Sequence, residues 1–297
     1  MKNSFNYTKL KGNLIMLLTA VIWGTSFISQ KVGMETIKPA TFNGIRLLIG
    51  SVVLLPFIIF REKQNKTSHT YKTSDNKVLL LSGIICGILL CIATTVQTWG
   101  MMYTTSGKSG FITAMYMIFV PFFGILLKKS IPKIAFLSAF IAFLGLYLLC
   151  GLTELSGFNF GDFLTLICAV TFTFHILAID HFSPKVDGIK LSALQFFVAG
   201  IICFVIMLIF DKPDIALIFD CAIPILYSGV FSCGIAYTLQ TIGQKYTDPV
   251  SASILMSLES VFALISGVII LGEPINFIEI IGCALMFGAI ILNTLKA

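Results

Sequence analysis

Three ionisable residues lie well inside apolar stretches of the sequence: Arg46, His175 and Glu259. A charged side chain at the centre of a membrane helix costs about 2.5 to 3.5 kcal/mol on insertion scales, so each of these residues is expected to face protein or water and is a candidate for function. Glu259 lies nearest the middle of its stretch, where a carboxyl group could exchange protons or hold the cation of a solute. We expect Glu259 to be the coupling residue. A structural Glu259, paired with Arg46 or capping exposed backbone, is the open alternative.

The other two ionisable residues are weaker candidates for a functional role. The apolar stretch that contains Arg46 begins at Pro39, only about two helical turns earlier. The long side chain of Arg46 could therefore reach the membrane surface. We therefore expect Arg46 to be a structural charge. His175 could be a hydrogen-bonded packing residue or a substrate contact.

Polar side chains recur at steps of three and four residues along six apolar stretches, as expected of helices that line an aqueous path. They are Thr19, Trp23, Ser26 and Gln30; Thr94 and Gln97; Ser109, Thr113 and Tyr116; Thr165, Phe172 and His175; Cys233, Tyr237, Gln240 and Gln244; and Ser253, Ser257 and Ser260 beside Glu259. Any single one could instead join two helices through a hydrogen bond worth about 0.6 kcal/mol.

Taken together, the polar positions predict a central cavity. The candidate substrate-binding residues are Trp23, Ser26, Gln97, Tyr116, His175, Tyr237, Gln240 and Glu259. Three of them, Trp23, Tyr116 and Tyr237, could offer aromatic faces to an organic solute or a cation. Simple helix packing is the alternative for Trp23.

The elements that carry these residues are membrane helices. Hydrophobic residues make up 57% of the 297 residues, charged residues only 11%, and the mean hydropathy is +0.96. Stretches of about 20 apolar residues, enough to cross a bilayer, lie at 12–32, 39–60, 78–101, 106–127, 132–151, 160–180, 190–210, 221–245, 248–271 and 275–295. The sequence therefore predicts an all-α integral membrane protein with ten transmembrane helices.

A repeated phrase divides these ten stretches into two units. Gln97-Thr-Trp-Gly-Met-Met-Tyr-Thr104 recurs as Gln240-Thr-Ile-Gly-Gln-Lys-Tyr-Thr247, each time at the end of the third stretch of a five-stretch half. Five crossings reverse the direction of entry, so residues 1–151 and 152–297 are predicted to be inverted five-helix repeats. Tyr103 and Tyr246 would lie at opposite mouths of the path and are the candidate gates. A helix-end signature with tyrosine at the membrane interface is the alternative.

The distribution of positive charge predicts the orientation. With the N-terminus inside, fifteen of the twenty lysine and arginine residues fall on the inner side, so both termini are expected in the cytoplasm of a cell-membrane protein. The positive charges behind the net charge of +6 thus determine the orientation of the chain in the membrane, and we expect no nucleic-acid partner. All eight cysteines fall within the predicted spans, so we interpret them as apolar packing residues. We expect the protein to have no metal site and no cofactor.

These features favour a secondary active transporter that moves a small metabolite by alternating access, with protons as a candidate coupling ion and membrane lipids around it. The alternative is a membrane-embedded enzyme acting on a lipid-linked substrate, for which Asp180 and His181 are the nearest catalytic pair. A channel is disfavoured because no charge ring or filter sequence is present. Ten helices could enclose a cavity without a partner, so we expect a monomer that is not an enzyme.

The chain resembles the EamA family of the drug/metabolite transporter superfamily from about Gly12 to Leu295. The resemblance is carried by Ala20-Val-Ile-Trp-Gly-Thr-Ser-Phe27, Arg46, Tyr103-Thr-Thr-Ser-Gly-Lys-Ser-Gly110, Tyr116-Met-Ile-Phe-Val-Pro121, Ser257-Leu-Glu-Ser-Val-Phe-Ala263 and Leu271-Gly-Glu-Pro274. It implies ten helices in two inverted repeats, a cavity lined by helices 1, 3, 4, 6, 8 and 9, and transport of metabolites such as amino acids or amines, with export favoured. Ser260 and Lys128-Lys129-Ser130 depart from the family pattern.

Overall fold

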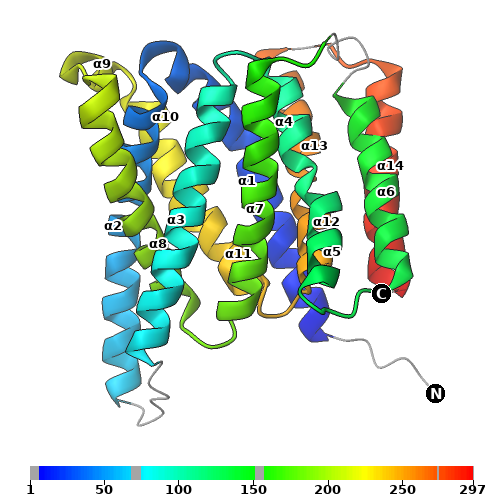
Figure 1. Cartoon of the computed structure of the whole chain (residues 1–297), viewed down its shortest axis with the longest axis horizontal. Coiled ribbons are helices and arrows are strands. Elements are labelled where there is room, and N and C mark those ends of the chain that lie inside the picture. Colours follow the sequence, from blue (N-terminus) through cyan, green and yellow to red (C-terminus); the bar gives the residue numbers. More distant parts are fainter. Residues whose placement is uncertain (1–6, 68–74, 151–156, 273, 297) are drawn as a thin grey trace.

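The computed structural model describes residues 7–67, 75–150, 157–272 and 274–296, and within these ranges the chain is helical with no β-strand (Figure 1). The helices are α1 (Tyr7–Thr36), α2 (Pro39–Thr67), α3 (Asn76–Gly100), α4 (Ser106–Ala114), α5 (Tyr116–Leu126), α6 (Lys133–Leu149), α7 (Phe160–Phe182), α8 (Gly188–Ile206), α9 (Ile215–Asp220), α10 (Ala222–Tyr227), α11 (Thr238–Gly243), α12 (Pro249–Met256), α13 (Glu259–Ser266) and α14 (Phe277–Lys296), with π-helical segments η2 (Met207–Asp211), η3 (Ser228–Tyr237) and η4 (Gly267–Leu271). Residues 151–156, where the predicted repeats meet, and Glu273 lie outside these ranges.

Nine helical stretches in the described ranges are long and apolar enough to cross a membrane. They are Tyr7–Thr36, Pro39–Gln64, Asn76–Gly100, Gly107–Leu126, Phe160–Phe182, Gly188–Asp211, Ala222–Gly243, Pro249–Ile270 and Phe277–Leu295. The remaining predicted span forms α6, which is apolar but has only 17 residues. That length is at the lower limit of about 17 to 25 residues for a crossing helix. The sequence thus predicts one long span more than the structure shows.

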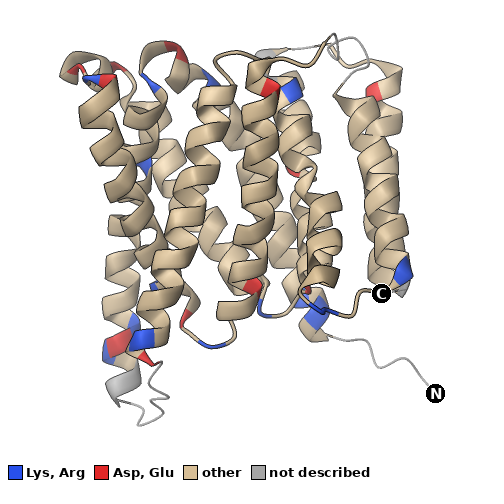
Figure 2. Cartoon of the chain, viewed as in Figure 1, with Lys and Arg blue, Asp and Glu red and all other residues tan. Residues whose placement is uncertain are grey.

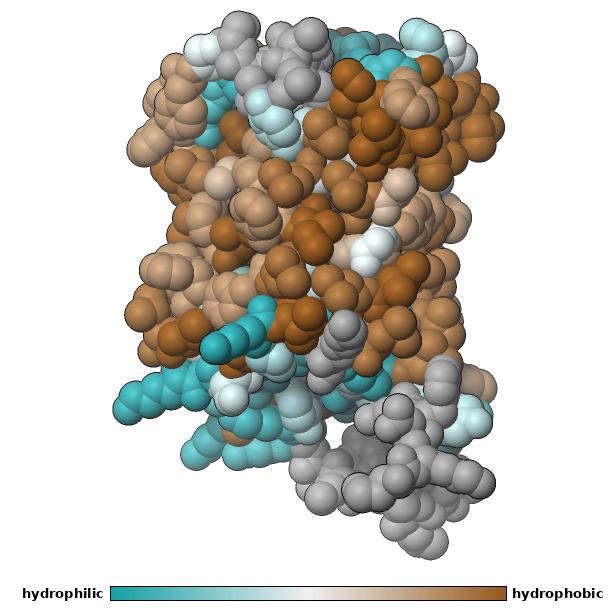
Figure 3. Space-filling view, turned by 90° about the vertical axis from the view of Figure 1, so that its right-hand side faces the viewer, coloured by the Kyte–Doolittle hydropathy of each residue, from teal (hydrophilic) through white to brown (hydrophobic). Residues whose placement is uncertain are grey.

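The surface of the bundle matches a bilayer. An apolar belt surrounds its middle (Figure 3), and the charged residues gather at its two ends (Figure 2). The start of α1 and the end of α14 lie at the same end of the bundle (Figure 1), which we call the terminal face; α9 lies at the opposite face. The chain is a multi-pass membrane protein, since a belt of exposed leucine, isoleucine and phenylalanine would be costly in water.

Helix pairs approach closely where glycines remove side chains from the contact. A Cβ atom on Gly282 of α14 would lie 2.5 Å from the carbonyl oxygen of Gly145 in α6, and one on Gly161 of α7 would lie 2.5 Å from that of Gly100 in α3. Ala284 and Gly288 of α14 are small residues four positions apart, a spacing found at close helix contacts, yet both are exposed. Gly288 is exposed with nothing near it, because the facing surface of α14 is centred on Gly282.

Two of the spans are broken near their middle, and the breaks place two polar residues inside the bundle. The span formed by α4 and α5 turns at Met115, and the span formed by α12 and α13 turns at Ser257 and Leu258. Tyr116 begins α5 and Glu259 begins α13. Each broken span also starts with a side-chain cap, from Thr105 and Asp248 respectively. Broken helices in membranes occur where the backbone faces protein or a cavity.

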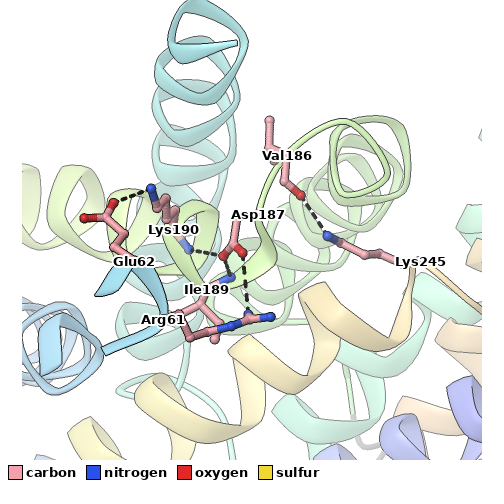
Figure 4. A network of polar contacts seen from close by, with 7 residues as sticks. All are labelled: Arg61, Glu62, Val186, Asp187, Ile189, Lys190 and Lys245. Atoms are coloured by element: carbon pink, nitrogen blue, oxygen red, sulfur yellow. Dashed lines mark hydrogen bonds and ion pairs between the residues drawn. The ribbon is translucent and has the colours of Figure 1, made fainter. Parts of the chain in front are cut away.

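A network of ion pairs and hydrogen bonds joins α2 to the turn between α7 and α8 at the terminal face (Figure 4). It consists of Arg61–Asp187 at 3.5 Å, Lys190–Glu62 at 2.5 Å, bonds from the backbone of Ile189 and Lys190 to the Asp187 carboxylate, and a 2.7 Å bond from Lys245 Nζ to the Val186 carbonyl. Burial lowers the pKa of Lys245 below its usual value; Asp187 opposes this shift and Arg61 adds to it. The network ties the ends of four spans together.

Candidate functional site

A polar cavity lies at the centre of the bundle. Its wall is built by Trp23, Phe27 and Gln30 of α1, Arg46 of α2, Gln97 of α3, Thr113 of α4, Tyr116 of α5, Phe172 and Ile176 of α7, Ser232 and Tyr237 of η3, Gln240 of α11, Met256 of α12 and Glu259 of α13. Seven spans therefore contribute, and the cavity is the place where the two broken spans meet the π-helical one. π-Helical turns inside longer helices are frequent at functional sites.

Arg46 is oriented by a chain of hydrogen bonds. The Asn43 amide donates to the Thr94 carbonyl and the Thr98 hydroxyl, and its oxygen accepts from Arg46 Nε at 3.0 Å. The Phe42 ring covers one face of the guanidinium, with Cζ 5.3 Å from the ring centre. Arg46 is only 2% exposed, and no carboxylate of the described ranges lies within 4 Å. Its Nη groups are thus free to meet a ligand in the cavity.

Glu259 faces the cavity from the first turn of α13 and is 8% exposed. It shares the cavity wall with Tyr116, and no basic residue of the described ranges forms an ion pair with it. The pairing of Glu259 with Arg46, which is open from the sequence, is absent here. A buried carboxylate without a cationic partner carries a desolvation cost that a ligand cation or a proton can relieve.

Aromatic rings form the middle of the wall. The Trp23 ring meets the Tyr237 ring edge to face with centroids 4.6 Å apart, and Trp23 Nε1 donates to the Ser232 carbonyl at 3.4 Å. That carbonyl belongs to η3, the π-helical segment. Tyr237 lines the same cavity as Arg46 and Glu259. An apolar or cationic part of a solute would meet these rings.

Glutamine side chains close the cavity on its terminal side. Gln240 Nε2 donates to Gln244 Oε1 at 3.1 Å, and Gln244 Nε2 donates to the Ile176 carbonyl at 3.0 Å. The Oε1 atom of Gln240 is buried and has no partner in the described ranges. The volume of the cavity is about 40 Å³, which holds a few water molecules. A metabolite can therefore enter only if helices move apart.

The structure separates the eight candidate substrate-binding residues into two groups. Trp23, Gln97, Tyr116, Tyr237, Gln240 and Glu259 line the cavity. Ser26 is buried and donates to the Ile22 carbonyl of its own helix, and His175 is buried behind the wall, with Nε2 3.0 Å from Gln195 Oε1. Neither residue reaches the cavity.

Some wall residues were not singled out from the sequence. Phe27, Ile176 and Met256 are apolar and give no signal that separates them from lipid-facing residues. Ser232 contributes from a π-helical segment whose spacing differs from the expected step of three and four. Arg46, which the sequence predicts to be a structural charge, lies in the cavity wall. The polar residue Asn43, one helical turn before Arg46, is the sequence signal that could have indicated that this face of the helix points into the protein.

The two copies of the repeated phrase lie at opposite faces and make corresponding contacts. The Thr104 hydroxyl donates to Asp162 Oδ1 at 2.7 Å, whereas the Thr247 hydroxyl donates to Asn13 Oδ1 at 3.2 Å. The Tyr103 ring packs on Phe160, at 5.6 Å between centroids, and Lys11 Nζ lies 5.1 Å from the centre of the Tyr246 ring. Both tyrosines thus contact the first turns of a helix in the other half of the chain.

A buried ion pair distinguishes the face opposite the termini. Lys108 Nζ lies 2.6 Å from Asp162 Oδ2 and also donates to the Gly157 carbonyl at 2.6 Å. The side chains of Lys108 and Asp162 are 6% and 0% exposed. Asp162 in turn completes a capping box with Asn159 at the start of α7. This pair fastens α4 to α7 beside the first copy of the repeated phrase.

The fold and the cavity together define a multi-pass membrane protein with a polar site at its centre. The model of the EamA-like transporter family matches residues 10–151 and again residues 159–295. The chain belongs to the EamA-like transporter family.

Relatives cover nearly the whole chain. A protein of Archaeoglobus fulgidus, named an uncharacterized transporter, is 30% identical over 97% of this chain and 87% of its own length. The uncharacterized transporter YoaV of Bacillus subtilis is 26% identical over 96% and 97%, and the uncharacterized inner membrane transporter YedA of Escherichia coli K12 is 23% identical over 93% and 88%. A solved crystal structure is similar in fold, with a TM-score of 0.78, 18% identity, and coverage of 96% of this chain and 97% of that one.

Proposed function

We propose that this protein is a secondary active transporter that moves a small organic solute across the cytoplasmic membrane by alternating access. The observation that carries the proposal is the central cavity, in which Arg46 and Glu259, neither of them in an ion pair within the described ranges, face the same buried space. Charged residues inside a membrane mark solute and ion pathways. Family membership supports the same class of function.

Two inverted five-helix repeats are the architecture that fits this function, with α6 as the tenth span. The family model matches the chain twice, once in each half. The paired contacts of Thr104 with Asp162 and of Thr247 with Asn13 support the same relation. So do the breaks before Tyr116 and Glu259. Rocking of two such repeats around a fixed site would open the cavity to each side in turn, with Tyr103 and Tyr246 as gates.

Protons are the proposed coupling ion, with Glu259 as the residue that binds them. One proton that crosses a potential of 100 mV supplies about 2.3 kcal/mol. We place both termini in the cytoplasm because the terminal face carries most of the lysine and arginine residues. Export is the proposed direction, and the protomer is proposed to work alone because one bundle encloses the whole cavity.

The nearest candidate residues of the enzyme alternative, Asp180 and His181, each have a partner in the protein. Asp180 is engaged by the Lys129 ammonium group, and His181 Nε2 lies 2.6 Å from Lys185 Nζ. Within the described ranges, no three His, Cys, Asp or Glu side chains are grouped to hold a metal ion. These contacts support a structural role for Asp180 as an ion-pair partner and for His181 as a hydrogen-bond partner at the end of α7.

Counterflow into proteoliposomes tests the proposal. Vesicles are loaded with unlabelled solute, and uptake of labelled solute is followed for a panel of amino acids, choline-like amines and nucleosides. A carrier gives transient, saturable accumulation of labelled solute above its equilibrium level. Equilibration without an overshoot for a permeant solute would indicate a channel, and chemical conversion of a solute would indicate an enzyme.

A further inference from the structure

A second hollow opens on the outer surface of the bundle and shares no wall residue with the central cavity. It is a groove of about 540 Å³ that follows α7 between α3 and the end of α5. This volume lies within the range of about 300 to 1,000 Å³ found for ligand sites. The side chains that define the groove are Leu89, Leu127, Phe174, Leu177, Lys129 and His181. The groove is open to the outside, since the Leu127 side chain is 57% exposed and that of Phe174 is 38% exposed.

The groove is apolar at one end and basic at the other. Phe174, Leu177 and His181 follow one another on the same side of α7, at steps of three and four residues. The helix rises about 10 Å from Phe174 to His181, which is about two thirds of the hydrocarbon thickness of one leaflet. Both α5 and α7 end at the terminal face (Figure 1), so Lys129 and His181 lie toward the membrane surface and Phe174 lies deeper. This order of polar and apolar parts matches that of a phospholipid.

Positive charge prevails at the basic end. Lys129 pairs with Asp180 of α7, but an ammonium group has three N–H donors, so Lys129 can still donate to a second acceptor. Lys185 Nζ lies 2.6 Å from His181 Nε2, and the exposed Lys128 directly precedes Lys129 in the chain. Three ammonium groups therefore stand beside one carboxylate. An anion at this end of the groove is attracted, whereas a group without net charge is not.

We propose that the groove binds one anionic phospholipid from the leaflet at the terminal face. An acyl chain lies along Phe174 and Leu177, and the phosphate group lies among Lys128, Lys129 and Lys185. Basic pockets between membrane helices are known to bind the head groups of acidic lipids. The apolar part of the groove favours a lipid over a free anion, and the basic end favours an acidic lipid over a neutral one. The site requires only a membrane around the protein and does not depend on the proposed transport.

Native mass spectrometry of the delipidated full chain in detergent tests the site. The probes are phosphatidylglycerol and phosphatidylcholine with the same acyl chains, since both carry the phosphate but phosphatidylcholine adds a cation that cancels its charge. Lys128→Gln combined with Lys185→Gln removes two ammonium groups and leaves the pair of Lys129 with Asp180 intact. The matched control is Lys31→Gln combined with Lys38→Gln, which removes two exposed ammonium groups at the opposite face.

A second pair of variants tests the apolar part of the groove. Ala178→Phe places a ring in the groove, because Ala178 lies in its wall. Gly288→Phe is the matched control, because it adds the same ring at an exposed position of α14 with nothing near it. Thermal unfolding in detergent checks that each variant keeps its fold.

We expect wild type to bind phosphatidylglycerol about tenfold more tightly than phosphatidylcholine. The preference should disappear in the variant at Lys128 and Lys185 and persist in its control. Ala178→Phe should weaken the binding of phosphatidylglycerol severalfold, whereas Gly288→Phe should leave it unchanged. Glycerol phosphate, which carries the phosphate without acyl chains, should not displace the lipid at equal concentration.

Three results would overturn the proposal. One is equal binding of the two lipids by wild type. Another is a folded variant at Lys128 and Lys185 that keeps the full preference for phosphatidylglycerol. The third is a folded Ala178→Phe protein with unchanged affinity, or displacement of the lipid by glycerol phosphate at equal concentration, because either outcome would show that the apolar groove takes no part in binding.

Discussion

Lys108 and Asp162 show how much a single residue pair can contribute when both charges are buried. In a low-dielectric site, the attraction between two opposite charges offsets the free-energy cost of removing them from water only while both are present. Either charge alone is costly to bury. The pair also holds the first turn of α7, through Asn159 and Thr104, next to the first copy of the repeated phrase. Loss of the pair should therefore lower the stability of the protein and disturb the packing at the mouth of the cavity.

We predict that Lys108→Met lowers the free energy of unfolding by about 3 to 5 kcal/mol at neutral pH, because Asp162 stays buried without its cation. The double variant with Asp162→Asn should recover a large part of this loss. Thermal unfolding in detergent measures both. The matched control is Lys190→Met, since Lys190 and Glu62 form a partly exposed pair, for which a loss below about 1 kcal/mol is expected. Equal losses for Lys108→Met and Lys190→Met would refute the prediction.

Residue types alone could predict part of the site. Trp23, Gln97, Tyr116, Tyr237, Gln240 and Glu259 are polar or aromatic residues within apolar stretches, and such residues stand out because lipid-facing positions rarely carry them. Ser26 and His175 are also polar residues within apolar stretches, but Ser26 donates to the Ile22 carbonyl and His175 Nε2 contacts Gln195, and neither lines the cavity. Hydrogen bonds of this kind depend on the exact rotation of each helix, which the spacing of residues does not determine.

At the scale of the helices, hydrophobic length predicts most of the spans but not their interruptions. No proline or glycine stands at the turns at Met115 and Ser257 that could have predicted them from the sequence. The proline in α5, Pro121, lies six residues after Met115. The π-helical course of η3 likewise has no marker in the sequence. These features result from packing against neighbouring helices, and they position Tyr116, Glu259 and Ser232.

We predict that Gly161→Ala weakens the contact of α7 with α3 and lowers stability by about 1 to 3 kcal/mol. A Cβ atom at Gly161 would meet the backbone of Gly100, Tyr103 and Thr104, which cannot rotate away as a side chain can. Gly288→Ala is the control, because nothing lies near that position, and there alanine should raise stability by up to about 1 kcal/mol through its better helix propensity. The comparison by thermal unfolding fails if both variants shift in the same direction.

At the scale of the whole molecule, the account requires that the cavity open to one side at a time. The described structure has a narrow cavity, with Gln240 and Gln244 across its terminal side and the Lys108–Asp162 pair near the opposite face. Tyr103 and Tyr246 pack on α7 and α1, so removal of either ring should release a different mouth.

We therefore predict opposite effects of Tyr103→Ala and Tyr246→Ala on access to the cavity. In a Thr113→Cys protein whose eight native cysteines are replaced by alanine, a membrane-impermeant thiol reagent should label faster from the face opposite the termini after Tyr103→Ala, and faster from the terminal face after Tyr246→Ala. Tyr147→Ala is the control, because Tyr147 packs on Phe111 and does not line the cavity. If labelling from both sides is unchanged in both variants, the tyrosines anchor helix ends and do not gate.

The measurement that tests the central claim most directly is accumulation of a labelled solute under an imposed pH gradient, expressed relative to its counterflow without a gradient. Wild type, Glu259→Gln and Glu259→Asp are compared in proteoliposomes. The account predicts that wild type and Glu259→Asp accumulate solute when the gradient is applied. Glu259→Gln should show counterflow at high solute concentration but no accumulation driven by pH. Equal accumulation by Glu259→Gln and wild type would contradict the account.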